Sequence, residues 1–307
     1  MSRILGAVQG LYKIPLMKDK DFPSWFQVAD KLSRKYQNQF YCLYFLHLIF
    51  LVALTTLSLY PDISKWTISI QIIIVVGTLL SSLGLFLNKP DRKWYSARAL
   101  AESIRTITWR YVTKAEPFHE DSNIAKVKFI NAIKKITNQN QDLKLLIKCD
   151  INENLISYEM EGLRNGTLQR RKSAYLSDRI ESQLEWYKKN SRKNNLMSNI
   201  LFSLVILLNI VAIILAASRL GYIEEKIWPT DIIVTIAIGL VGWIQVKKYS
   251  ELSASYSLTA SEITQIHIDY FLYPINDEKT FSNFVGDTEN AFSREHTQWY
   301  ARKDHFS

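Results

Sequence analysis

FYCLYFLHLIFLVALTTLSLY, residues 40–60, contains no Asp, Glu, Lys or Arg. At a rise of 1.5 Å per residue, this stretch makes a helix about 30 Å long, which is the thickness of the hydrocarbon core of a bilayer. Buried helices of soluble proteins seldom carry an uncharged apolar run of this length. The stretch therefore predicts a helix that spans a membrane.

Three more apolar stretches follow, and the four stretches form two pairs along the sequence. They are WTISIQIIIVVGTLLSSLGLFLN at 66–88, the run containing NILFSLVILLNIVAIILAAS at 194–218, and 227–246. The last is the least apolar of the four, because Pro229 and Asp231 lie near its start. Only five residues separate the first two stretches and eight the last two, so each pair is predicted to form a tight antiparallel hairpin.

Positive charge predicts the orientation of both hairpins. Lys and Arg gather before the first and third stretches and after the second and fourth. The link at 61–65 holds Lys65 alone, and the link at 219–226 offsets its two positive charges with Glu224 and Glu225. Because cytoplasmic flanks carry the excess of Lys and Arg, both termini and the middle segment are expected in the cytoplasm. The expected location is the inner (cytoplasmic) membrane, as a multi-pass protein.

The two hairpins lie about 160 residues apart and share flanking residues, which indicates an internal duplication. The tripeptide at 33–35 and that at 191–193 both read Ser-Arg-Lys, and Trp25 and Trp186 precede them. Glu102 and Glu262 lie in matching places after the hairpins. Both copies share one orientation, so the repeat is parallel, unlike the inverted repeats of many secondary transporters.

The polar segments are predicted to be helical. Helical patterns cover residues 93–115, 124–136, 152–163, 173–193, 249–271 and 288–302. The fold class expected is all-α: four transmembrane helices in two parallel-repeated hairpins, with a helical cytoplasmic domain. Along the chain, this gives an N-terminal segment at 1–39, a hairpin at 40–88, a helical region at 89–193, a hairpin at 194–246 and C-terminal helices at 247–307.

Composition narrows the function classes. The net charge is +9 and the pI about 9.3, which favours contact with anions such as lipid headgroups, nucleotides or nucleic acid. Neither a P-loop nor a GxGxxG or GxSxG element occurs, and the five histidines form no HxxxH or HExxH pair. We therefore expect no enzyme activity, no catalytic residues, no bound metal and no cofactor.

Polar residues inside the spans are the first candidate site. Such groups are costly against lipid, so they should face protein or water. The candidates for lining a pore are Gln71, Thr78, Ser82, Asn209 and Thr235. The alternative role is hydrogen bonding between helices, with the small residues Gly77, Ser81 and Gly84 allowing close packing.

Three groups of basic and aromatic residues are the second candidate, because guanidinium groups bind phosphate and aromatic rings stack on bases. The first group is Arg164, Arg170, Arg171 and Lys172, close to Tyr175; the second is Arg105, Trp109 and Arg110; the third is Arg294, His296, Trp299 and Arg302. The alternative is that these charges hold the membrane topology or contact anionic lipid.

Four segments resemble a known family. WYSARALAESIRTITWRYVTKAEPF at 94–118 resembles the segment after the hairpin in SLATT proteins, the SMODS- and SLOG-associating transmembrane effectors. YLSDRIESQLEWYKKNSRKN, YSLTASEITQIHIDY and ENAFSREHTQWYARK, in the second half, resemble another branch of that family. The chain is therefore interpreted as two tandem SLATT units, with residues 120–172 the least characteristic part.

The resemblance implies a role in bacterial antiphage defence. Such proteins are regarded as pore-forming effectors, encoded near nucleotidyltransferases or nucleotide-sensing domains. The function expected is a pore or ion channel, opened or held closed by a nucleotide or short oligonucleotide from a neighbouring nucleotidyltransferase, that depolarises the membrane and arrests growth. Four spans enclose little aqueous path, so a homo-oligomeric ring is expected, with a tetramer as one economical form.

Two other functions stay open at this stage. One is a non-conducting membrane scaffold that recruits a soluble toxin or nucleotidyltransferase through its basic helices. The other is a transporter, which the parallel repeat and the absence of charge within the secure spans disfavour.

Overall fold

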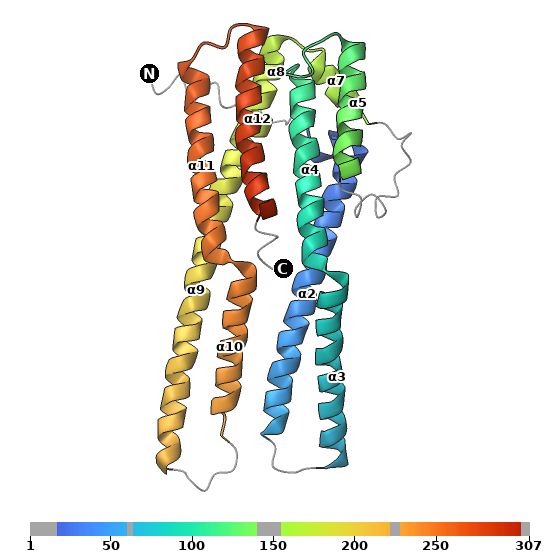
Figure 1. Ribbon diagram of the computed structural model, residues 1–307. Helices are drawn as coiled ribbons and strands as arrows, with labels where there is room; N and C mark the ends of the chain where they lie inside the picture. Colours follow the sequence, from blue (N-terminus) through green and yellow to red (C-terminus); the bar gives the residue numbers. More distant parts are fainter. Residues whose placement is uncertain (1–16, 60–63, 140–154, 222–227, 302–307) are drawn as a thin grey trace. The chain divides into compact units, whose positions relative to one another are not determined.

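The computed structural model of the chain describes residues 17–59, 64–139, 155–221 and 228–301, with side chains up to residue 293 in the last range. All regular structure in these ranges is helical, which confirms the all-α prediction. The elements are drawn in Figure 1. In chain order they are η1 (Asp19–Asp21), α2 (Ser24–Ser58), α3 (Lys65–Asn88), α4 (Pro90–Val112), α5 (Ser122–Gln139), α7 (Tyr158–Arg164), α8 (Leu168–Ala174), the π-helix η2 (Tyr175–Glu181), α9 (Ser182–Ser218), η3 (Arg219–Gly221), α10 (Thr230–Lys247), α11 (Tyr249–Leu272) and α12 (Glu278–Ala301).

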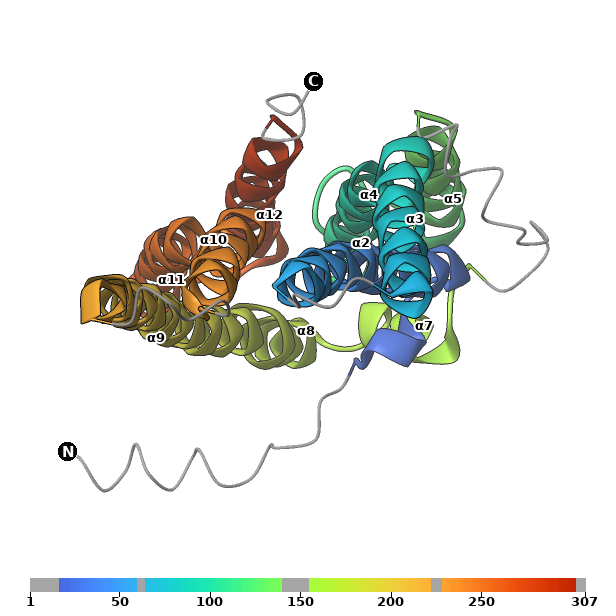
Figure 2. The same ribbon diagram turned by 90° about the horizontal axis from the view of Figure 1, so that it is seen from below.

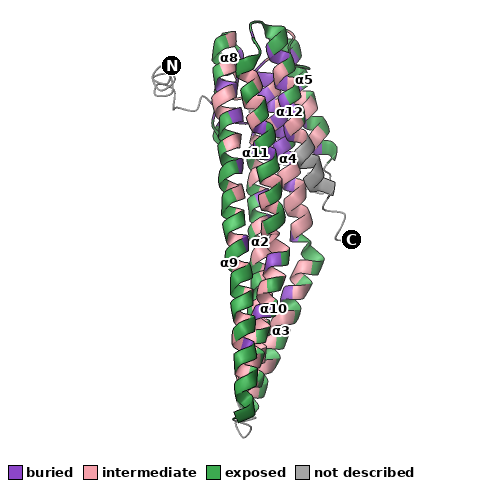
Figure 3. Cartoon of the chain, turned by 90° about the vertical axis from the view of Figure 1, so that its left-hand side faces the viewer, coloured by how far each residue is buried: buried purple, intermediate pink, exposed green. Residues whose placement is uncertain are grey.

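Four helical stretches in the described ranges are long and apolar enough to cross a membrane, and each overlaps one of the four predicted spans. Their large apolar side chains point outward: Leu80 is 61% exposed, and Ile213 is 68% exposed. Along these spans, Figure 3 shows mostly exposed and intermediate residues. Outward apolar faces of this length are stable only where lipid replaces water. The chain is a membrane protein.

The chain divides into two compact units. The spanning unit comprises Tyr36–Asp91 and Lys188–Leu258, and the polar unit comprises Met1–Lys35, Arg92–Tyr187 and Thr259–Ser307. The division of the sequence into five segments with membrane boundaries at 40, 88, 194 and 246 stays a prediction.

Within the spanning unit, the four membrane helices stand in a row, in the order α9, α10, α2, α3 (Figures 1 and 2). Hydrogen bonds join neighbours along the row. The Trp228 indole donates to the Leu215 carbonyl at 2.8 Å, and the Thr235 hydroxyl of α10 donates to Thr55 of α2 at 3.4 Å. The two hairpins therefore meet through α10 and α2, while α9 and α3 occupy the ends of the row.

The two hairpins end in the same way. Lys89 follows α3 and Lys248 follows α10, and both residues adopt left-handed backbone angles, with φ of 43° and 51°. Each donates its backbone N–H four residues back, to Leu85 and Ile244 respectively, which closes the helix as a C-cap. The next helix, α4 or α11, begins at once. These matching caps, about 160 residues apart, are a structural counterpart of the sequence repeat.

Several helix boundaries differ from the sequence prediction. α2 begins at Ser24, well before the first span, because Trp25, Phe26 and Ala29 in its first turns are buried within the polar unit. α12 begins at Glu278 rather than 288, because Asp277 accepts the backbone N–H of Thr280 and caps the first turn. α4 ends at Val112, before Pro117, because Lys114 takes a left-handed conformation.

Replacing Gly77 should destabilise the first hairpin. A Cβ at Gly77 would lie 2.7 Å from Cζ of Phe50 and 2.8 Å from Cε2, closer than any normal contact. We expect Gly77→Ala to lower the free energy of unfolding in detergent by about 1–3 kcal/mol, the usual cost of overpacking. Gly239→Ala is the control, because its Cβ would meet Leu48 Cδ2 at an ordinary 3.8 Å. Equal melting temperatures for the two variants would contradict this packing.

Candidate functional site

The polar residues predicted to line a pore occupy three different helices of the row. Gln71, Thr78 and Ser82 share one flank of α3 and are half-buried. Asn209 of α9 is exposed, and its amide donates to its own helix at the Val205 carbonyl. Thr235 of α10 bonds to Asp231 O and faces Thr55. α3 stands at the opposite end of the row from α9 and α10, so these residues do not surround a common channel within one chain. Pore lining by them stays a prediction.

One intramembrane histidine joins the first hairpin. His47 Nδ1 lies 3.1 Å from the Ser81 hydroxyl and 3.3 Å from that of Ser82. Both serine hydroxyls also donate to the Thr78 carbonyl. Ser82 therefore has an interhelical partner, which is the alternative role that the sequence left open for the polar residues of this span.

In the polar unit, most of the first basic group holds the fold together. The guanidinium of Arg164 is 2% exposed and donates to the carbonyls of Tyr111, Phe118 and Glu120. Arg171 is equally buried and binds Glu278 and the Thr113 carbonyl, while Lys172 donates to the Ile275 carbonyl. Arg170 alone of this group is exposed. These bonds occupy the N–H groups that a phosphate ligand would need.

The bond from Arg171 also affects its acidic partner. Hydrogen bonding to the guanidinium holds the pKa of the Glu278 carboxyl below its usual value. A carboxyl with a lowered pKa in the folded chain contributes stability at neutral pH, and that stability is lost as the pH falls through the lowered value. Glu278 is more than half exposed, so solvent screening keeps the contribution small.

The second group is likewise part of the core. Trp109 is 2% exposed and makes edge contacts with the rings of Phe22 and Tyr175, so no face is open for stacking on a base. Arg110 donates to the Asn290 side chain and the Gly286 carbonyl. Arg105 binds the buried Glu102. Of the third group, Arg294, His296 and Trp299 have no described side chains, and Arg302 lies outside the described residues.

A buried ion pair ties α12 to the π-helix η2. Arg179 Nε and Nη2 donate to the two carboxylate oxygens of Glu289 at 2.9 and 2.8 Å, and both side chains are almost fully buried. The Tyr175 hydroxyl donates to the same carboxylate at 3.0 Å. Burial alone would lower the pKa of Arg179, but the charge of Glu289 outweighs it and raises that pKa. Burial and Glu289 raise the pKa of Tyr175 well above its ordinary value.

The duplicated positions have diverged in their surroundings. Glu102 is buried and bound by Arg98 and Arg105, whereas its sequence counterpart Glu262 is exposed. Trp25 is 7% exposed, but Trp186 is 41% exposed. Both pairs indicate that the first copy has kept a core role at these positions that the second copy lacks.

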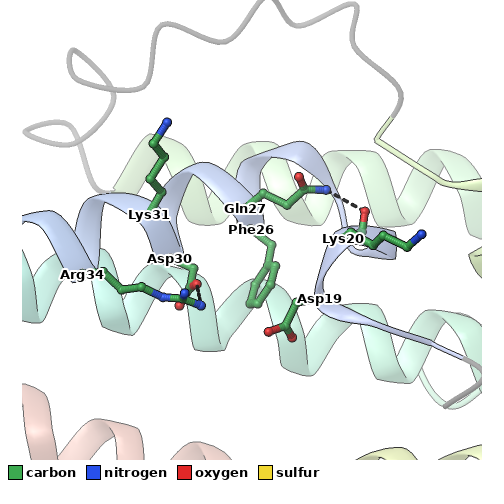
Figure 4. Close-up of a pocket in the computed structure, with 7 residues that line it drawn as sticks. All are labelled: Asp19, Lys20, Phe26, Gln27, Asp30, Lys31 and Arg34. Atoms are coloured by element: carbon green, nitrogen blue, oxygen red, sulfur yellow. Dashed lines mark hydrogen bonds and ion pairs between the residues drawn. The ribbon is translucent and has the colours of Figure 1, made fainter. Parts of the chain in front are cut away.

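A pocket of about 310 Å³ lies at the start of α2, entirely within the polar unit (Figure 4). Its volume is at the lower end of the range typical of small-molecule sites. The lining residues are Asp19, Lys20, Phe26, Gln27, Asp30, Lys31 and Arg34. Helical spacing places Phe26, Gln27, Asp30, Lys31 and Arg34 along successive turns of α2, and η1 supplies the other two.

The charges in this pocket are unequally paired. Arg34 binds Asp30 at 2.5 Å, and Arg105 reaches Asp19 at 3.5 Å with its guanidinium over the Phe26 ring. Lys20 and Lys31 are exposed and have no carboxylate partner among the described residues.

The amide of Gln27 adds a neutral acceptor. Its Nε2 donates to the carbonyls of Lys20 and Phe22, which leaves Oε1 as an acceptor for a ligand N–H. Lys20 and Lys31 lie on either side of this amide, and their ammonium groups point away from each other (Figure 4). In the described part of the chain, no three His, Cys, Asp or Glu side chains gather as metal ligands would.

The sequence analysis predicts an N-terminal segment at 1–39 and names no helix within it, so it does not bring the residues of this pocket together. Phe22, Phe26, Ala29, Ser33 and Tyr36 recur every three or four residues, and all five are buried. That spacing predicts an amphipathic helix and would have placed Lys20, Gln27 and Lys31 near one another.

Fold and spans together define a multi-pass, all-α membrane protein built from two duplicated helical hairpins. Family models give the same division: residues 23–172 match SMODS and SLOG-associating 2TM effector domain 3, and residues 175–299 match SMODS and SLOG-associating 2TM effector domain 1. The chain belongs to the SLATT family and carries two of its transmembrane effector domains in tandem. No curated protein and no solved structure matches it.

Breaking the buried pair should unfold the polar unit more easily. Glu289→Gln leaves the buried guanidinium of Arg179 without a counter-charge, which typically costs about 3–5 kcal/mol. We expect a clear fall in the thermal unfolding temperature of the purified chain. Asp287→Asn makes the same change two residues away at an exposed position and should leave that temperature unchanged. A matching fall in both variants would contradict the structural role of the pair.

Proposed function

We propose that the chain is the subunit of an oligomeric membrane pore that a nucleotide or short oligonucleotide opens or closes. The observation that carries the proposal is the tandem pair of 2TM effector domains on four spans that stand in an open row. A single row has two free ends, α9 and α3, and encloses no path by itself. Several copies joined end to end in a closed ring would enclose one.

In such a ring, the two hairpins of each subunit would form one segment of the wall of the pore. Polar residues on the flanks of the helices would then face water or a neighbouring subunit instead of lipid. Gln71 and Asn209 are the strongest candidates, because each carries an amide on a span at an end of the row. Conduction through such a pore would dissipate the membrane potential of a bacterial cell and arrest its growth, as an effector of antiphage defence would.

The proposed ligand site is the pocket at the start of α2. Lys20 and Lys31 would bind phosphate groups, and the Gln27 Oε1 would accept an N–H of a base. The ligand gates the pore only if it binds the open and closed forms with different affinity. A nucleotidyltransferase encoded nearby is the proposed source of this ligand. Both termini and the polar unit are proposed to lie in the cytoplasm, where such a nucleotide is made.

The alternative is a non-conducting scaffold that recruits a soluble toxin or the nucleotidyltransferase. One observation favours it: α5 is basic and leaves Ile124 and Val127 more than half exposed in the polar unit. An exposed apolar pair on a basic helix fits a protein contact. Ion flux separates the two functions, because a scaffold conducts in no ligand state.

We expect purified chain in liposomes to release a potassium gradient in one ligand state and to retain it in the other. The probes are a panel of cyclic dinucleotides and short linear oligoadenylates, and the readout is a potassium-sensitive dye. K20Q/K31Q should keep the maximal flux but raise the midpoint of the nucleotide response by on the order of tenfold or more, because two charge-assisted contacts are lost.

The matched control is K189Q/K279Q, which removes the same charge from exposed positions of α9 and α12. Its midpoint should equal that of the unmodified chain. If no flux occurs with any probe or in the absence of probes, the pore is excluded and the scaffold remains as the proposed function. Flux with a normal nucleotide response in K20Q/K31Q would retain the pore but exclude this pocket as the ligand site.

A further inference from the structure

The outward side of α5 combines apolar and basic side chains. Ile124 and Val127, near its start, are each more than half exposed. Lys134 and Lys135 follow on the same side of the helix, are exposed, and have no carboxylate partner among the described residues. The helix contains no Asp or Glu, and its two other lysines are bound by glutamates of the chain. We call these four side chains the α5 stripe; it is apolar at one end and positive at the other.

A stripe of opposite charge follows the part of α11 that belongs to the polar unit. Residues 259–272 contain Glu262 and Asp269 but no Lys or Arg. Glu262 is exposed and has no cationic partner among the described residues, and Asp269 accepts a hydrogen bond from a neutral amide. Ile268 and Leu272 lie on the same side of the helix and are 43% and 67% exposed. We call these four side chains the α11 stripe; it ends in an apolar pair and carries two carboxylates.

The two stripes match in length when the helices lie antiparallel. At a rise of 1.5 Å per residue, Lys135 lies about 16 Å from Ile124 along α5, and Glu262 lies about 15 Å from Leu272 along α11. If Ile124 is set level with Leu272, the ammonium groups of α5 therefore fall level with Glu262. Apolar side chains then face apolar ones, and a positive charge faces a negative one.

Within one chain the two stripes are separated. α5 and α11 stand on opposite sides of the polar unit, with α4 and α12 between them (Figures 1 and 2). α5 begins and α11 ends at the same end of this unit, so the two helices run in opposite directions (Figure 1). Rotation about an axis parallel to them keeps these directions. The α5 helix of one copy can therefore lie antiparallel to the α11 helix of the next.

We propose that the α5 stripe of one copy binds the α11 stripe of the next, so that the polar units join head to tail in a ring. This inference rests on the proposed function, because it names the surfaces that join the subunits of the proposed oligomer. A contact between two different surfaces closes into a ring when its rotation allows. The charges also select this contact, since two α5 stripes or two α11 stripes would bring like charges together.

Mass photometry of the full chain in detergent, over a series of concentrations, tests the contact. The charge reversals K134E/K135E and E262K/D269K should each raise the concentration of half-assembly by on the order of tenfold or more, because each brings like charges together at the interface. The fourfold variant K134E/K135E/E262K/D269K should assemble nearly as the unmodified chain does, because opposite charges meet again.

The matched control is E159K/D287K, which reverses two exposed carboxylates of the polar unit outside both stripes. It should assemble as the unmodified chain does. All variants should also keep the thermal unfolding temperature, since the reversed side chains of the stripes make no ion pair within the described chain.

The outcomes separate this contact from the pore. Assembly that both twofold reversals weaken and the fourfold variant restores supports the contact even if no nucleotide produces flux. Flux from oligomers that neither reversal weakens would retain the pore and overturn the contact, and it would leave the α5 stripe to a recruited protein. Weakened assembly that the fourfold variant fails to restore would also overturn the pairing of these two stripes.

Discussion

Lipid in place of water around the spanning unit is the constraint on which the rest of this structure depends. Hydrocarbon offers no partner to a backbone N–H or carbonyl, so each span must satisfy its own backbone as a helix. The same absence of water removes the hydrophobic drive between spans, so close packing and polar contacts must hold them together. Gly77 against Phe50, and His47 against Ser81, are contacts of these two kinds.

The polar unit is stabilised by different forces. Its core excludes water around aromatic rings such as Trp109 and Tyr175, and it also buries three arginines. Each buried guanidinium is tolerable because carbonyls or a carboxylate accept most of its N–H groups, although the Nε–H of Arg164 has no partner among the described residues. Arg164 fixes the loop after α4, and Arg179 fixes α12. The positive charge of this sequence is therefore partly internal to the fold and does not measure how strongly the chain attracts anions.

The fold was largely predictable, since an uncharged run such as 40–60 needs no tertiary context to be identified. The repeat was predictable too, because Lys89 and Lys248 end equivalent helices at the expected spacing. The candidate site was not. Arg171 and Arg170 are neighbours of the same type in the sequence, yet one is buried against Glu278 and the other is exposed. Only packing distinguishes a structural guanidinium from one available to a ligand.

That distinction changes where an anionic ligand is to be sought. A buried arginine with all its partners in place binds phosphate only by breaking bonds that the fold needs, so its net contribution to affinity is small. An exposed lysine without a carboxylate loses only hydration and side-chain freedom. Lys20 and Lys31 in the polar unit meet this condition. The residues best placed to bind an anion are therefore lysines outside the arginine-rich segments.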